Sequence, residues 1–305
     1  MLLDLSDRAK YKVTGKDRVR YLNGQLTNDI LSLRPGSAIH ACALTAKGKL
    51  CGDLFVAAAP EESHYLDAES VLRESLAARL EKYIIADDVT LEDVTDEFGL
   101  FHLIDPETAT AESQALAALG TLEETVTFLV ASNRFEFPGI DLWFPAKQAA
   151  LVQEQLKQSP IDAETAENLR IEQGIARWGN ELSEEVIPNE AGLDKRAINY
   201  TKGCYLGQEV ISRIKSVGHV NRHLCGLLPA AGIGLEIGDK LFADAESEKE
   251  IGRITSIGRS RRLDRTIALG YVRRGFDATG STLQVRRNNT LIGPIEVRSL
   301  PFNSP

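Results

Sequence analysis

The chain has 305 residues, of which 43% are hydrophobic and 26% are charged, which is typical of a soluble globular protein with more than one core. No apolar run approaches the ~18 residues that a membrane-spanning helix needs. The start, Met1–Asp4, meets an acidic residue at once, so we expect neither a secretory signal nor a membrane anchor, and we expect a cytoplasmic protein. There is no Gly-x-Gly-x-x-Gly motif and no P-loop, which argues against a nucleotide cofactor.

Charge is distributed unevenly along the chain. Residues 195–305 hold 18 Lys and Arg against 10 Asp and Glu, whereas residues 1–194 hold 17 against 34. A basic C-terminal third on an acidic chain favours contact with an anionic partner, such as RNA or an acidic protein face. A solvated basic face without any partner explains the same pattern, because isolated Arg pairs without interleaved aromatic residues are not a nucleic-acid motif.

The first two thirds of the chain predict short strands alternating with helices. A helix over 16–23 is expected to end at Gly24, and the polar run Thr27–Asp29 suits the start of a second helix. Further helices are expected over 70–83, 106–119, 146–157 and 162–174. Strands are expected over 10–14, 38–45, 50–58, 64–68, 89–94, 99–104, 125–130, 133–137 and 140–144. This order indicates an α+β fold with two ferredoxin-like halves.

From His219 onward the pattern becomes all-β. Short β-rich runs alternate with turns that contain Gly, and six strands at this spacing predict a small β-barrel. The expected strands are 224–228, 240–243, 251–257, 266–272, 282–285 and 292–297. We therefore predict two domains, residues 1–219 with the two α+β halves and residues 220–305 with the barrel.

The octapeptide Lys202–Glu209 is the strongest candidate for a reactive site. A cation lowers the pKa of a nearby thiol, so Cys204 and Lys202 are the candidate catalytic residues. Glycines on both sides of the thiol permit positive φ or a close approach of a ligand. From chemistry alone, a tight turn around a small buried cysteine is the favoured explanation, because one Cys without a nearby His or second Cys is weak evidence of reactivity. The remaining residues of the motif are Gly203, Tyr205, Gly207, Gln208 and Glu209.

The sequence predicts no metal site. The four cysteines contain no Cys-x-x-Cys pair, and the five histidines contain no His-x-x-x-His spacing. Cys42 and Cys51 are expected near opposite positions of the first hairpin, as small core residues rather than as ligands.

Four motifs, which follow one another along the chain in the family's order, resemble the YgfZ family. Its members are the folate-binding relatives of the glycine cleavage T-protein (aminomethyltransferase). The octapeptide is similar to the family signature Lys-Gly-Cys-Tyr-x-Gly-Gln-Glu. Tyr21–Asp29 resembles its Gly-Gln-x-Thr-Asn-Asp segment, Leu44–Lys49 resembles its first hairpin turn, and Leu169–Gly174 resembles the Leu-Arg-x-Glu-x-Gly segment that T-proteins share. The resemblance implies a T-protein-like, three-lobed folate-binding fold with two α+β lobes and a C-terminal barrel.

The resemblance also implies a function. The expected protein binds tetrahydrofolate or a one-carbon derivative and supports assembly or repair of iron–sulfur clusters, and thereby tRNA modification by cluster enzymes. Its expected partners are iron–sulfur enzymes or assembly factors, and the basic C-terminal third suits RNA or the polyglutamate tail of a folate. The alternatives are an aminomethyltransferase that passes a one-carbon unit to tetrahydrofolate, and a folate-binding scaffold with an inert Cys204. T-proteins have no Cys at this place, which favours the first hypothesis over the aminomethyltransferase.

The same resemblance implies four folate-binding residues. Glu172 matches a T-protein glutamate that contacts the pterin ring, and Arg170 lies in the same segment. Asp53 matches the second member of a T-protein Asp-Asp pair that contains the catalytic aspartate, whereas Gly52 stands at the first place. Asn28 matches an Asn of both subfamilies, and it suits either ligand contact or local capping of the backbone.

Overall fold

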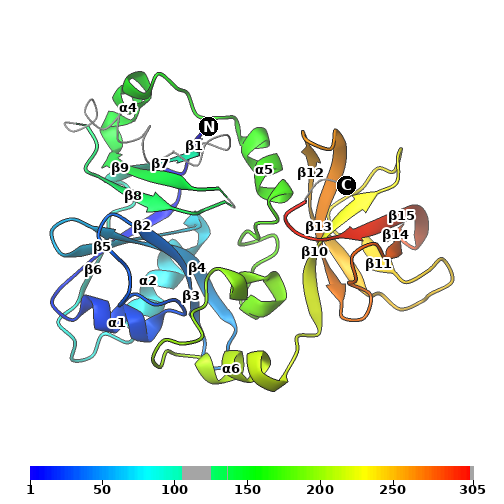
Figure 1. Cartoon of the computed structure of the whole chain (residues 1–305), viewed down its shortest axis with the longest axis horizontal. Coiled ribbons are helices and arrows are strands. Elements are labelled where there is room, and N and C mark those ends of the chain that lie inside the picture. Colours follow the sequence, from blue (N-terminus) through cyan, green and yellow to red (C-terminus); the bar gives the residue numbers. More distant parts are fainter. Residues whose placement is uncertain (105–124, 136, 303–305) are drawn as a thin grey trace. The chain divides into compact units, whose positions relative to one another are not determined.

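A computed structural model describes residues 1–104, 125–135 and 137–302 (Figure 1). The chain forms two compact units. The first contains Met1–Asp162 and Asp194–Ser212, and the second contains Ala163–Leu193 and Arg213–Pro305. The helix predicted over 106–119 lies outside the described residues.

An antiparallel five-stranded sheet of order β3-β4-β5-β2-β6 organises the first unit. Its strands are β2 (Ala9–Thr14), β3 (Ala38–Leu44), β4 (Leu50–Ala59), β5 (Ser63–Ala68) and β6 (Thr90–Asp93). Leu72, Leu76 and Leu80 are buried and line one face of the helical segment predicted over 70–83. The helices of this part are α1 (Arg18–Gln25), η1 (Ser70–Leu72) and α2 (Arg73–Glu81).

A second antiparallel sheet in this unit has the order β1-β7-β9-β8. Its strands are β1 (Leu2–Asp4), β7 (Phe98–Ile104), β8 (Phe128–Ser132) and β9 (Gly139–Pro145), followed by η2 (Ala146–Gln148) and α4 (Ala149–Leu156). Trp143 on β9 is fully buried. The strand predicted over 133–137 is wrong, because residues 133–135 form no strand and the Arg134 side chain enters a buried ion-pair network instead.

The predicted second helix at Thr27–Asp29 is also wrong, because tertiary partners take the polar groups of this run. The Thr27 hydroxyl donates to the carbonyl of Ala197 (2.6 Å) and accepts from the backbone N–H of Cys42 (2.8 Å). The first helix does not end at Gly24 either, since α1 continues to Gln25.

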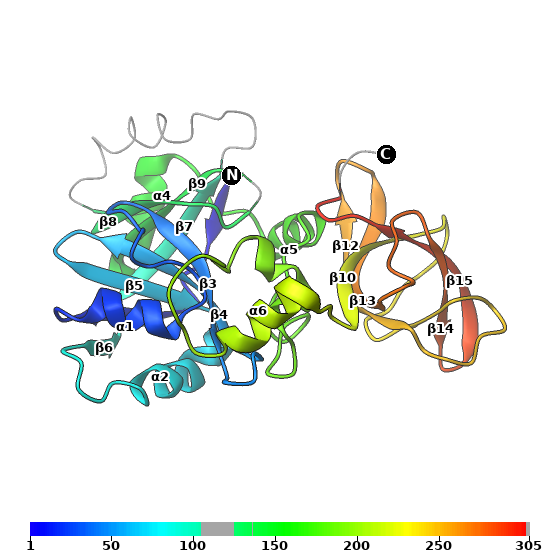
Figure 2. The same cartoon turned by 60° about the horizontal axis from the view of Figure 1, so that its bottom comes forward.

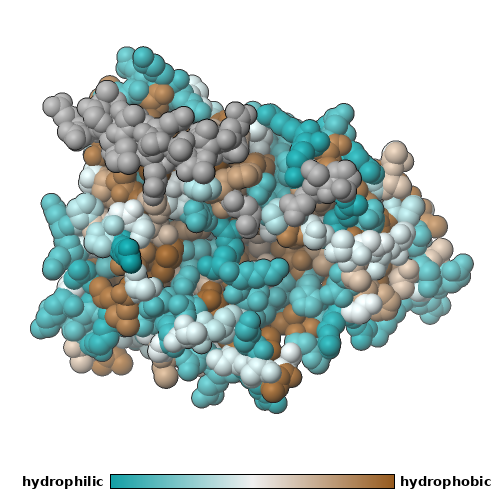
Figure 3. All heavy atoms as spheres, viewed as in Figure 1, coloured by the Kyte–Doolittle hydropathy of each residue, from teal (hydrophilic) through white to brown (hydrophobic). Residues whose placement is uncertain are grey.

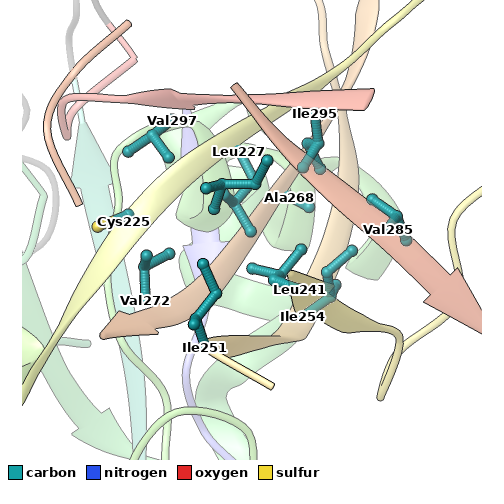
Figure 4. Packing of buried hydrophobic residues seen from close by; sticks show 11 residues of the cluster. Cys225, Leu227, Leu241, Ile251, Ile254, Ala268, Val272, Val285, Ile295 and Val297 are labelled. Atoms are coloured by element: carbon teal, nitrogen blue, oxygen red, sulfur yellow. The ribbon is translucent and has the colours of Figure 1, made fainter. Parts of the chain in front are cut away.

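The second unit contains a closed six-stranded barrel of order β10-β13-β12-β11-β14-β15, which confirms the predicted barrel. Its interior is filled by branched aliphatic side chains, and Figure 4 shows those of Leu227, Ile254 and Ile295 among them. The strands are β10 (Arg222–Pro229), β11 (Lys240–Phe242), β12 (Gly252–Ser260), β13 (Arg265–Arg273), β14 (Thr282–Arg287) and β15 (Thr290–Arg298).

Short helices precede the barrel in the sequence. They are α5 (Ala163–Glu172), η3 (Pro188–Ala191), η4 (Leu193–Lys195) and α6 (Gln208–Val217). The side chain of Asn168 on α5 accepts a hydrogen bond from the backbone N–H of Arg259 on β12 (2.7 Å), which fixes α5 to the barrel.

The surface drawn in Figure 3 mixes hydrophilic and hydrophobic residues. None of the helices in the described ranges combines the length and the apolar character that a bilayer crossing requires.

Candidate functional site

The octapeptide lies against two of the segments that the sequence analysis selected. Figure 2 shows the chain before α6 running beside β3 and β4. The backbone N–H of Asn199 donates to the carbonyl of Thr27 (3.0 Å), and that of Leu206 donates to the carbonyl of Gly24 (3.1 Å). The motif near residue 204 and the segment near residue 25 therefore form one structure in the first unit.

The Lys202 ammonium is held by three backbone carbonyls. It donates to those of Asn23 (2.7 Å), Leu26 (2.8 Å) and Asn28 (2.5 Å). Asn23 belongs to the last turn of α1, where carbonyls lack partners within the helix and a cation is favourable. Burial lowers the pKa of Lys202 to about 8, so the group remains protonated at pH 7. These carbonyls use all three ammonium protons, so none is left to donate to the Cys204 thiol.

Cys204 is exposed, whereas Cys42 and Cys225 are buried and Cys51 is partly covered. Burial raises the pKa of the Cys42 thiol well above its usual value and that of Cys225 to about 12. The thiolate is the reactive form of cysteine, so these two buried groups are poor nucleophiles at neutral pH. Cys204 is the thiol of this chain that solvent and a ligand reach most easily.

The Gln208 side chain organises the turn around this thiol. Its oxygen accepts from the backbone N–H of Tyr205 (2.9 Å), and its Nε2 lies 3.7 Å from the Cys204 sulfur, within donor range. A thiolate accepts such a bond more strongly than a thiol does. Glu209 lies in the first turn of α6, where a carboxylate is favourable.

The two glycines of the motif differ in their surroundings. Gly207 has a φ of +86°, and a Cβ there would lie 2.5 Å from the carbonyl oxygen of Thr45. A Cβ added at Gly203 would have no heavy atom within 4 Å, and the φ of this residue is not in the left-handed region. The fold requires glycine at 207, whereas Gly203 leaves open space beside the thiol.

Tyr205 provides the buried side of the motif. The residue is 9% exposed, and the Lys202 ammonium lies 5.3 Å from the ring centroid. Burial raises the pKa of the Tyr205 hydroxyl to about 12, so it stays protonated at neutral pH.

Asn28 fastens the backbone around the motif. Its Nδ2 donates to the carbonyls of His40 (2.8 Å) and Arg196 (3.3 Å), and its oxygen accepts from the N–H of Asp29 (2.9 Å). These bonds give Asn28 the local backbone role that the sequence analysis weighed against ligand contact.

Asp53 pairs with a histidine that the sequence analysis did not select. The Nε2 of His40 lies 3.3 Å from an Asp53 carboxylate oxygen, and the two side chains are 7% and 13% exposed. Burial lowers the pKa of His40, which favours the neutral imidazole. Among the described residues, His40 Nδ1 and Asp53 Oδ1 are buried and have no hydrogen-bond partner. With Nε2–H donating to Asp53, both atoms are acceptors, so a ligand with two donors would satisfy them.

The strand register places positions 52 and 53, which match the expected Asp-Asp pair, on opposite faces of the sheet. Cys42 is paired with Asp53 and His40 with Phe55, so these side chains share one face of the sheet. A Cβ at Gly52 would instead lie 3.4 Å from the side chains of Leu72 and Leu76, on the face that η1 and α2 cover. A carboxylate at position 52 would enter an apolar layer, and the carboxylate on the opposite face is the one this chain retains.

The same register places Cys51 differently from the expectation. Cys42 opposes Asp53, and Cys51 lies within a register shift, because Ala43 pairs with Gly52 and Leu44 pairs with Leu50. A one-residue irregularity of this kind moves a side chain to another position of the ladder.

A rigid base supports the His40–Asp53 pair. The His40 ring stacks on Phe55 with centroids 4.6 Å apart, and the Arg134 guanidinium lies 4.2 Å from the Phe55 centroid on β4. Arg134 is buried and forms ion pairs with Asp67 (2.6 Å) and Asp141 (2.8 Å). Fully paired buried charges of this kind fix side-chain positions.

Glu172 is the last residue of α5 in the second unit, two residues before the end predicted at Gly174. Its carboxylate accepts from the Ser260 hydroxyl (2.7 Å) and from Nε of Arg262 (3.3 Å). These donors offset the unfavourable position of a carboxylate at a helix C-terminus.

Arg170 has a structural role that argues against the expected folate contact. It bonds to both oxygens of Glu167 (2.9 and 2.8 Å), to Glu181 (3.0 Å), to the Ser256 hydroxyl (2.7 Å) and to the carbonyl of Ile175. Five N–H donors make five bonds, so none remains for a ligand. The side chain fixes α5 to β12 of the barrel.

Within the described ranges, no three His, Cys, Asp or Glu side chains form a group that could hold a metal ion.

Comparisons with known proteins agree with this architecture. Residues 1–144 match the GCVT N-terminal domain, and residues 222–303 match the glycine cleavage T-protein C-terminal barrel domain. The crystal structure of the glycine cleavage system aminomethyltransferase T from Bartonella henselae superposes with a TM-score of 0.83 at 23% identity, covering 99% of this chain and 86% of that one. The fold is therefore of the aminomethyltransferase type, with a closed barrel of six strands at its C-terminal end.

Two relatives carry more specific names. The tRNA-modifying protein YgfZ of Yersinia pestis is 28% identical, in an alignment that covers 99% of this chain and 92% of the relative. The mitochondrial iron-sulfur cluster assembly factor IBA57 homolog of Dictyostelium discoideum is 26% identical over 256 residues, 73% of this chain. That match spans 61% of the length of the Dictyostelium protein. The chain is thus a homologue of the YgfZ and IBA57 proteins, built from the N-terminal and C-terminal domains of the glycine cleavage T-protein.

Proposed function

We propose that this protein binds tetrahydrofolate and supports the assembly or repair of iron–sulfur clusters, and through cluster enzymes the modification of tRNA, with Cys204 as the reacting thiol. The observation that carries the proposal is the placement of Cys204. It is exposed on a turn that Lys202 and Gln208 hold in place, while Cys42 and Cys225 are buried. The names of the relatives supply the cluster and tRNA context.

The first unit offers groups that fit a reduced folate. The pterin edge carries several hydrogen-bond donors and acceptors, and Asp53 Oδ1 and His40 Nδ1 are buried without partners among the described residues. A carboxylate accepts strongly from a flat amino-pyrimidinone edge, as it does from guanidinium. When bound, tetrahydrofolate supplies a carrier for one-carbon units, and this chain supplies the acceptors that orient it.

A thermal-shift titration with tetrahydrofolate tests the folate part. A ligand at about 100 times its Kd stabilises the folded state by roughly 2.7 kcal/mol. We expect Asp53→Asn to lose most of this shift, while the exposed control Asp264→Asn keeps it. We propose the same loss for Glu172→Ala in the second unit, measured separately. An unchanged shift in Asp53→Asn would remove Asp53 from the site, and no shift with any reduced folate in the wild type would reject folate binding.

Thiol labelling tests the Cys204 part. We expect a small alkylating reagent to modify Cys204 before the other three cysteines, and bound tetrahydrofolate to slow that reaction. Cys204→Ser should fold normally, because the side chain is exposed and fills no core volume, yet it should fail to support cluster-dependent enzymes in cells. A Cys51→Ser variant is the matched control and should remain active. Full cellular activity of Cys204→Ser would leave an inert-thiol scaffold as the explanation.

Aminomethyl transfer to tetrahydrofolate is the second candidate. One observation favours this activity. The carboxylate that the chain retains, Asp53, shares the sheet face of His40, whereas position 52 faces Leu72 and Leu76. Incubation with a lipoyl-carried aminomethyl donor and tetrahydrofolate would release ammonia if this activity is present. We expect no release above the rate without protein, and release that depends on Asp53 would make transfer the function.

A further inference from the structure

The second unit contains two adjoining hollows, which neither the octapeptide nor the His40–Asp53 pair lines. One has a volume of about 830 Å³ and the other of about 630 Å³, and both are lined by Asn221 and Arg273. Their combined size exceeds what a single phosphate or carboxylate would fill. We refer to the two hollows, which share these two residues, together as the groove, and their combined size suits an extended chain.

Two arginines of this groove face each other across neighbouring strands, an arrangement that lowers the stability of the sheet. Arg222 on β10 and Arg273 on β13 stand directly opposite each other in the strand register. Like charges at opposed positions of a sheet are destabilising. Both side chains line the larger hollow, so a bound anion would relieve their repulsion.

The acidic residues of the groove are already paired. Glu250 forms ion pairs with Lys240 (3.0 Å) and Arg253 (3.2 Å). Asp277 pairs with His223 at 2.5 Å, and the Glu181 carboxylate is buried against Arg170 (3.0 Å).

The groove also contains charges without partners. Arg273 and Arg274 are exposed, and among the described residues their side chains form no hydrogen bond or ion pair. The groove therefore presents two guanidinium groups without partners in the described part of the chain, whereas each of its carboxylates has a hydrogen-bond partner.

A flat surface lies beside these charges. The Arg222 guanidinium packs on the Tyr271 ring at 4.4 Å, is held by Glu190 (3.1 Å), and remains 41% exposed. A guanidinium plane fixed in this way offers its other face for stacking with a nucleobase. The Asn221 amide is exposed beside it and can donate to or accept from a base edge.

We propose that this groove binds the phosphate backbone of single-stranded RNA, with Arg273 and Arg274 on phosphates and Arg222 stacked against a base. Free guanidinium groups beside a fixed planar group match the pattern of single-strand recognition, which combines a basic groove with stacking. An acidic peptide or a polyglutamate chain has the charge but no bases to stack. This inference rests on the proposed function in one respect: the proposed role in tRNA modification acts through cluster enzymes, and the groove would add a direct contact with RNA.

Fluorescence anisotropy of the full-length protein with a labelled single-stranded RNA of about 12 nucleotides tests the proposal. We expect Arg273→Ala/Arg274→Ala to weaken binding at least tenfold at 50 mM KCl. Each lost phosphate contact lowers the salt slope by about 0.7, so the slope should fall by about 1.4. The control Arg259→Ala/Arg261→Ala removes the same charge from exposed barrel positions outside both hollows and should bind as the wild type does.

Three further outcomes bear on the proposal. Arg273→Glu should weaken binding more than Arg273→Ala, and neither should lower the thermal midpoint, because the side chain has no partner to lose and its repulsion with Arg222 is removed. Equal loss in the control pair, or equal competition by poly-glutamate and RNA, would overturn the proposal in favour of a general polyanion surface. Absence of RNA binding by the wild type would overturn it too, and an intact tetrahydrofolate shift in the same sample would leave the proposed folate function standing.

Discussion

The Lys202 ammonium joins segments that are more than 170 residues apart in the sequence. Its three acceptors are the carbonyls of Asn23, Leu26 and Asn28, at and just beyond the end of α1. A carbonyl that loses its partner away from water costs more than the bond itself contributes. Lys202 therefore stabilises the place where Cys204 is presented, whatever its effect on the thiol.

Replacing Lys202 by Met tests this role. The variant keeps the length of the side chain and removes the three donors, so we expect the free energy of unfolding to fall by about 2–3 kcal/mol. Urea denaturation measures it, with Lys195→Met as the control, since Lys195 is exposed in the same unit. A loss no larger than that of the control would show that water replaces the ammonium without cost.

Some residues of the site were accessible to sequence reasoning and others were not. The octapeptide is a contiguous motif, so Cys204 and its neighbours could be named directly. The acceptors of Lys202 are backbone carbonyls, which have no sequence signature. His40 was missed because its pairing with Asp53 depends on the register shift between Ala43 and Leu44, which no local pattern indicates.

Contact between two turns positions the motif. Gly207 leaves no room for a side chain against the carbonyl of Thr45, and a Cβ at Gly48 would lie 2.8 Å from the Val210 side chain on α6. The hairpin turn and the start of α6 thus approach each other as closely as only glycine permits.

A matched pair of substitutions separates shape from function at this contact. Gly207→Ala places a side chain at a positive φ and against the carbonyl of Thr45, so we expect the free energy of unfolding to fall by about 1–3 kcal/mol. Gly203→Ala should leave the stability unchanged, because its methyl group meets nothing within 4 Å. Equal stability of the two variants in urea would contradict the packing described here.

The helices and strands also divide into those that a local sequence pattern predicts and those that depend on tertiary contacts. The six barrel strands could be predicted because each has its own β-rich run bounded by turns. Strand β1 was missed since three residues, Leu2–Asp4, give too short a pattern, and its pairing with β7 is supplied by the fold. The helix expected at Thr27 failed for a related reason, because its hydroxyl is used by Ala197 and Cys42.

At the scale of the whole molecule, buried histidines are concentrated in one unit. His40, His64 and His102 are buried in the first unit, and burial lowers the pKa of each. The histidines of the second unit, His219 and His223, are not buried. Mild acid should therefore act mainly on the first unit.

The pKa of His64 sets the size of the expected loss of stability in acid. Burial lowers its pKa from 6.5 to about 4, so between these values the unfolded chain binds more protons than the folded one. The contribution of neutral His64 to the free energy of unfolding, about 3 kcal/mol, is fully present above pH 6.5. It is lost as the pH falls toward 4. Urea denaturation at pH 7.0, 5.5 and 4.5 should show the decline, and His64→Leu should show a decline smaller by about that amount.

The two tryptophans allow the units to be followed separately, because Trp143 lies in the first unit and Trp178 in the second. In a Trp178→Phe background, the fluorescence of Trp143 should report unfolding at lower urea as the pH falls. His219→Leu is the control and should leave the pH dependence unchanged, since that side chain is exposed. The same decline in His64→Leu as in the wild type would show that other groups, and not the neutral buried imidazole of His64, determine the acid response.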